Sequence, residues 1–157
     1  MKHFLFILSF ISFSYLLAAE PNPPAESDNI TCPIEQKSVK NGAAPDIELF
    51  KKLVRCKKGE KAAPKGEEGS VKVDISAIKV GDSRPWSARE DLGGGKVDTI
   101  VYPVKVTYSV TTYYRKATEY SDNWERVLNF YVNSFGEWQI GSEESISAGK
   151  FKRVNKD

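Results

Sequence analysis

Histidine is almost missing from this sequence of 157 residues, since His3 is the only one. It lies in a leader-like stretch, so the remainder of the chain lacks the side chain that titrates near neutral pH. This excludes Ser-His-Asp and Cys-His catalysis, and zinc or non-haem iron sites that use histidine. The two cysteines are too few for a thiolate-only zinc site. The sequence therefore predicts no metal ion and no cofactor.

Long apolar runs are missing too, except for residues 4–17, which follow Lys2 and precede Ala18 and Ala19. A short positive start, an apolar run and two small residues predict a signal peptide over residues 1–19, cleaved after Ala19. The run is short for a membrane-spanning helix, which needs about 20 residues. We therefore expect a secreted or periplasmic protein with no membrane span after cleavage.

Cysteine is limited to Cys32 and Cys56. In an exported chain this pair predicts a structural disulfide, because the compartment oxidises thiols and the spacing is not Cys-x-x-Cys. Asn29-Ile30-Thr31 matches the glycosylation acceptor pattern, which leaves open whether Asn29 is modified. The net charge of +2 indicates no particular partner.

The chain left after cleavage, about 138 residues, fits a single domain with one core. Residues 20–44 are rich in Pro, Asn, Ser and Ala, and they predict an extended N-terminal arm that Cys32 holds to the domain. Residues 45–145 carry the periodic patterns of a single α+β domain. Residues 146–157 are expected to form a C-terminal tail.

One helix is predicted over residues 45–59, where Ile47, Phe50 and Val54 share an apolar stripe and Gly59 suits the C-cap. Alternating apolar residues predict strands over 71–80, 99–114 and 124–132, and a returning strand from 138 after a turn at 133–136. Residues 81–98 are expected to form a long loop with one helical turn, because Ser87 and Glu90 match a capping box. The expected fold class is α+β, one main N-terminal helix packed on a curved antiparallel sheet of about four strands.

The C-terminal hairpin carries a family resemblance: Trp124 opens a long strand, and NSFGEW at 133–138 leads into the last one. On this hairpin, residues 45–145 resemble the curled-sheet domains of the nuclear-transport-factor-2-like and cystatin-like groups. The resemblance implies a fold more than an activity. The Gln-x-Val-x-Gly hairpin of cystatin inhibitors is missing, and no motif marks the pocket Asp or His that the transport-factor-like enzymes commonly use with a Tyr.

Basic residues gather on the predicted helix and just after it, and this basic patch could hold an anionic ligand. The members are Lys51, Lys52, Arg55, Lys57, Lys58, Lys61 and Lys65. No aromatic residue interleaves the lysines, which favours a solvated helix face and makes nucleic acid an unexpected partner.

Trp86 lies between Arg84 and Arg89 in the expected loop, and these three residues are the predicted ligand contacts. Arginine suits a carboxylate or phosphate, and the indole could cover the apolar part of a ligand. The alternative, that Trp86 plugs the end of the core, is favoured because a large aromatic side chain gains most by burial.

Aromatic side chains recur along the predicted strands, where they would either line a concave pocket or pack as a core. The set is Tyr102, Tyr108, Tyr114, Tyr120, Tyr131, Trp124 and Trp138, and its alternating spacing favours the core.

These observations favour an exported, soluble, non-enzymatic domain that binds an unknown protein or a small anionic or apolar ligand. The first alternative is a small cone-shaped enzyme that uses a carboxylate/tyrosine acid-base pair, and the second is a cystatin-like protease inhibitor. A deep pocket with a buried carboxylate would favour the enzyme. A flat or filled sheet face would favour the interaction protein.

Overall fold

The computed structural model describes residues 30–61, 68–90 and 95–156. The predicted signal peptide, Asn29 and Lys65 lie outside the described residues. Within them the chain forms one helix, α1 (Ile47–Lys57), and six strands. The strands are β1 (Val71–Val80), β2 (Arg84–Glu90), β3 (Gly95–Tyr113), β4 (Ala117–Val132), β5 (Trp138–Ser147) and β6 (Lys150–Asn155).

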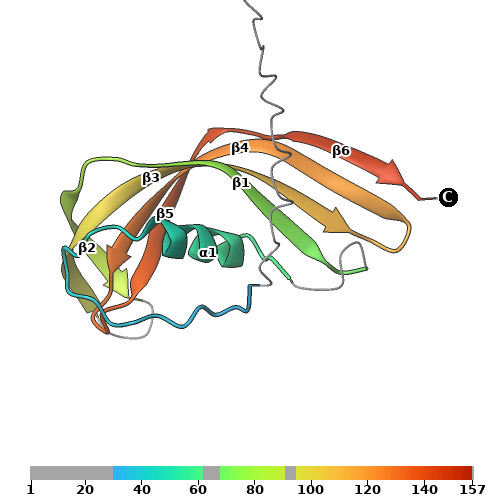
Figure 1. Ribbon diagram of the computed structural model, residues 1–157. Helices are drawn as coiled ribbons and strands as arrows, with labels where there is room; N and C mark the ends of the chain where they lie inside the picture. Colours follow the sequence, from blue (N-terminus) through green and yellow to red (C-terminus); the bar gives the residue numbers. More distant parts are fainter. Residues whose placement is uncertain (1–29, 62–67, 91–94, 157) are drawn as a thin grey trace, which may run out of the picture.

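The strands form one antiparallel sheet built around two long strands, β3 and β4, as Figure 1 shows. The first part of β3 pairs with β2 and the second part with β1. In the same way β4 pairs first with β6 and then with β5. The sheet curves, and α1 lies under one half of it (Figure 1).

The predicted fold class is wrong, because the described chain is dominated by a six-stranded sheet rather than by a helix on about four strands. The expected loop over 81–98, with its helical turn, is replaced by β2 and the start of β3, in which Ser87 lies opposite Asp98. The capping-box pattern is a short local signal, and pairing with a neighbouring strand overrides it. Residues 150–155, assigned by sequence to the C-terminal tail, form β6 on the edge of the sheet.

Proline falls where the ladder has a gap. Pro103 lies in β3 between the part paired with β2, which ends at Val101, and the part paired with β1, which begins at Val104. Since proline has no N–H to donate, it is tolerated at such a junction. Its carbonyl accepts a hydrogen bond from the Gly81 amide at 2.7 Å.

The predicted helix is confirmed. Asp46 caps its N-terminus by accepting a hydrogen bond from the Leu49 amide at 3.0 Å, and Gly59 has a φ of +78° just beyond the C-cap. Phe50 and Val54 point into the sheet and are fully buried. The Phe50 ring stacks on Phe130 with centroids 4.0 Å apart, so α1 fills the concave face of the sheet.

The predicted disulfide is confirmed too, since Cys32 is bonded to Cys56 in α1. Residues 30–44 have no helix or strand, yet they are held by more than the disulfide. The Gln36 side chain exchanges two hydrogen bonds with the backbone of Trp138, at 2.9 and 3.1 Å, and the Val39 amide donates to Gly136 at 2.8 Å. The arm is therefore anchored at both α1 and the start of β5.

Candidate functional site

Trp86 lies on β2 opposite Thr99 of β3, and its indole reaches across the sheet to β5. The ring meets Tyr131 edge-on, with centroids 5.5 Å apart. A Cβ added at Gly141 of β5 would lie 2.4 Å from the indole, so the ring occupies space that only glycine leaves free. Tyr131 is 6% exposed and neighbours Phe130, so it lies on the face away from α1. Trp86 therefore packs against neighbouring residues, but on the face away from α1 and not at the end of the core, where the sequence analysis placed it.

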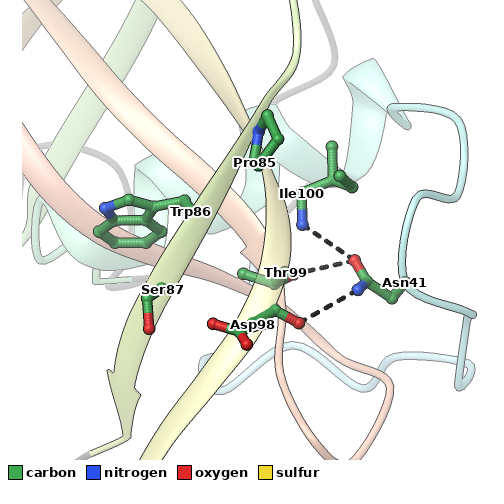
Figure 2. A pocket seen from close by; sticks show the side chains of 7 residues that line it. All are labelled: Asn41, Pro85, Trp86, Ser87, Asp98, Thr99 and Ile100. Carbon is green, nitrogen blue, oxygen red and sulfur yellow. Dashed lines mark hydrogen bonds between the residues drawn. The ribbon is translucent and has the colours of Figure 1, made fainter.

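A shallow depression of about 510 Å³, open to solvent, lies beside Trp86 and is shown in Figure 2. It is lined by Asn41, Pro85, Trp86, Ser87, Asp98, Thr99 and Ile100. Asn41 comes from the arm, and its side chain accepts hydrogen bonds from Thr99 Oγ1 at 2.9 Å and the Ile100 amide at 3.0 Å. It also donates to the Asp98 carbonyl at 3.3 Å. The Asn41 amide is thus engaged in tying the arm to β3 (Figure 2).

Of the two arginines, the structure describes the side chain of Arg84 alone, and it does not line this depression. Arg84 is exposed. By position along β2, Arg84 shares a face with Trp86, whereas the side chain of Arg89 lies outside the described part of the structure. Among the lining residues whose side chains the structure describes, the charged one is Asp98, whose carboxylate repels an anion. The depression therefore suits a small polar ligand better than the anionic one expected from the arginines.

The basic patch is partly neutralised in the structure. Lys51 pairs with Glu48 at 2.7 Å, Arg55 Nη2 donates to Glu60 at 2.6 Å, and Lys58 pairs with Glu143 at 2.5 Å. Lys52, Lys57 and Lys61 are exposed. Because three of its six described members have acidic partners, the patch is a weak attractor for anions.

Glu143 is the centre of a charge cluster that the sequence analysis missed. It accepts from Lys58 and from Arg126 Nε, the latter at 3.1 Å. Partial burial raises the pKa of Glu143, but hydrogen bonding and attraction from Lys58, with smaller contributions from Lys57 and Arg126, outweigh burial and leave the pKa below its ordinary value. Arg126 also stacks over the Trp124 ring at 4.4 Å. Lys58 and Glu143 are 85 positions apart, so no local pattern could reveal their pairing.

The aromatic set acts mainly as core. Tyr108, Tyr131 and Trp138 are buried, and Trp138 also meets Phe50 edge-on at 4.9 Å. Tyr114 is an exception, at 44% exposed. Among the described residues the buried polar side chains are Ser70, Thr99, Thr118 and Asn129, and none of them is a carboxylate. The pocket acid that the enzyme alternative needs is therefore not found in this part of the chain.

Residues 30–61, 68–90 and 95–156 contain no group of three or more His, Cys, Asp or Glu side chains placed to hold a metal ion. The same ranges contain no helix with the length and hydropathy needed to cross a membrane. Comparison with known proteins finds no matching family model, no matching curated protein and no matching solved structure. The resemblance to the curled-sheet families stays a prediction.

Proposed function

We propose that this chain is an exported, non-enzymatic protein-interaction domain. The observation that carries the proposal is the filling of the concave face, where Phe50 and Val54 of α1 are fully buried against Phe130, Leu128 and Trp138. In a curled-sheet enzyme that space is the natural place for a substrate. With the space filled, contacts with other molecules fall on the outside of the sheet.

Large apolar side chains on the outside support the same proposal. Phe135, in the turn between β4 and β5, is 69% exposed, and Phe151 on β6 is 65% exposed. Ile146 and Val154, on β5 and β6, are also exposed. Phe135 lies beyond Val132 at one end of β4 and Phe151 lies opposite Ser121 towards the other end, so they mark two separate exposed apolar sites that a partner could cover.

A photo-reactive amino acid placed at Phe135 or at Phe151 tests the proposal in the exported protein. We expect a covalent adduct with a polypeptide, either a different protein or a second copy, from at least one of these positions. Lys79, an exposed residue of β1, is the control position and should give none. Absence of polypeptide adducts at both phenylalanine positions would contradict the proposal.

A second candidate function is the binding of a small polar ligand beside Trp86. The depression there supports it, because its lining includes Trp86 together with the polar residues Ser87 and Asp98 (Figure 2). The contacts of Trp86 with Tyr131 and Gly141 favour a packing role instead. A Trp86→Ala variant that unfolds at the same temperature as the parent but no longer binds a small polar ligand would favour this second function.

A further inference from the structure

The outer edge formed by β5 and β6 carries opposite charges on its two halves. Both strands pair with β4, one after the other, and the chain passes between them at Ala148 and Gly149. The β5 half has Glu143 and Glu144, and the β6 half has Lys150, Lys152 and Arg153. An antiparallel copy of such an edge would place acidic residues opposite basic ones.

We propose that a second copy of this chain docks on this edge, giving a symmetric dimer in which the two sheets join through β5 and β6. The proposal rests on the proposed function and names one partner for it. In the pairing we infer, a twofold axis passes near Ala148, so Glu144 lies opposite Lys152 of the second copy and Glu143 opposite its Arg153.

Side-chain directions agree with this register. Glu143 is paired with Leu128 on β4 and contacts Lys58, so it lies on the α1 side of the sheet. Arg153 lies opposite Glu119 of β4, which in turn lies opposite Thr112 of β3. Thr112 is two residues from Val110 and shares its face, so Arg153 lies on the α1 side as well. Glu144 and Lys152, as their chain neighbours, lie on the opposite side. Each proposed ion pair therefore joins side chains on the same face of the combined sheet.

Backbone directions also agree. The Lys156 amide donates to Lys116, next to β4, at 2.9 Å, so alternation turns the amides of Phe151 and Arg153 away from β4. On β5 the backbone of Trp138 bonds Gln36 instead of β4. Along β5, backbone amides point alternately towards β4 and away from it, and the register shift between Asn129 and Phe130 adds one residue to β5. With that residue counted, the amides of Glu143 and Ser145 point away from β4. The outward groups of one copy thus meet outward groups of the other.

Charge also argues against other pairings of this edge. Two β6 strands side by side would bring Lys150, Lys152 and Arg153 against the same cations. Lysines on an edge strand commonly oppose pairing with other strands, whereas a strand that carries acidic residues can pair with them through opposite charge. The β5 half of the same chain is such a strand, and Phe151 would lie opposite Ser145 of the second copy and lose solvent exposure.

Charge reversal at one contact tests the proposal in the disulfide-bonded protein, with sedimentation velocity as the measurement over protein concentrations of about 1 to 200 μM. We expect reversible dimers whose dissociation constant rises about tenfold or more in Glu144→Lys and in Lys152→Glu, because each places like charges opposite one another twice per dimer. The double variant, Glu144→Lys with Lys152→Glu, should return to within about threefold of the parent. Lys79→Glu is the matched control for charge and should leave the constant unchanged.

Three outcomes would overturn the dimer. One is a protein that stays monomeric over the whole range, another is a dimer that neither single reversal weakens, and the third is a double variant no stronger than the single ones. If the protein is monomeric and a photo-reactive group at Phe151 still captures a different polypeptide, the dimer fails while the proposed function stands. If sedimentation shows the dimer but no adduct with any other protein forms, the interaction domain serves self-association.

Discussion

At the scale of single residues, Trp86 packs on the sheet face away from α1. The sequence favoured packing for this residue but placed it at the end of the core. Two flanking arginines make it look like part of an anion site, yet the indole packs on Tyr131 and over Gly141. The contact at Gly141 could not be predicted from sequence, because a glycine in a strand can equally mark a bulge, a bend or a close approach of another group. The aromatic core was predictable from alternation, whereas the pairing of Trp86 with a glycine on β5 depends on how the sheet curves.

Trp86 and Gly141 should be energetically coupled, and a double-mutant cycle measures the coupling. Gly141→Ala should destabilise the protein by about 1–3 kcal/mol, because the new methyl group collides with the indole. Trp86→Ala should cost about 1–2 kcal/mol, less than a core aromatic, because the indole is half-buried. In the Trp86→Ala background the Gly141→Ala change should cost clearly less, since the collision with the indole is gone and only the approach to Tyr131 Cε1, at 3.1 Å, remains. Equal effects of Gly141→Ala in both backgrounds, in urea unfolding, would show that the ring does not cover Gly141.

Glu143 should give the protein a stabilising contribution that depends on pH. Its folded-state pKa is lowered by its cationic neighbours, so the contribution is fully present above the ordinary glutamate value of 4.5 and is lost as the pH falls through the lower folded value. Glu143→Gln should therefore be less stable than the parent at neutral pH, with the difference shrinking in acid. Thermal unfolding from pH 7 down to about pH 3 measures this. Asp82→Asn, at an exposed position outside β5 and β6, is the control, and a difference that persisted unchanged in acid would refute the assignment.

At the scale of elements, local signals were sufficient where an element carries its own pattern. The helix has a cap, an apolar stripe and a terminal glycine, and β1 alternates up to Ile75, so both were predicted from sequence. However, a register shift between Ile75 and Ala77 turns Ile78 and Val80 inward. β2 was missed because RPWSARE contains a proline and a capping-box pattern, and its strand conformation depends on pairing with β3. β6 was missed because most of its residues are charged or polar and all are exposed, as suits an edge strand.

The disulfide between the arm and α1 should contribute to stability as an element-level cross-link. Cys32 and Cys56 are 24 positions apart, which corresponds to about 3.5 kcal/mol in the chain-entropy model. Replacing both with serine should lower the midpoint of urea unfolding accordingly. The arm should stay docked at β5 through Gln36, so Gln36→Ala should cost more in the serine variant than in the parent. Equal costs would show that the two anchors are independent.

At the scale of the whole molecule, two features follow from the fold. The helix fills the concave face, and the β5–β6 edge lies open with acidic and basic halves. The sequence predicted the helix and much of the sheet, but the order of strands along β3 and β4 is set by contacts far apart in the chain. The edge could not be recognised before β6 was known to be a strand.

The central claim, a filled interior with an open outer edge, is tested most directly by residue-resolved amide hydrogen exchange on the dilute protein. The account predicts slow exchange for Val104 and Leu128 in the middle of the sheet, and for Val54 in α1. It predicts fast exchange for the amides of Phe151 and Arg153, which point away from β4. Slow exchange at Phe151 and Arg153 in the dilute protein, or fast exchange at Val54, would contradict the claim.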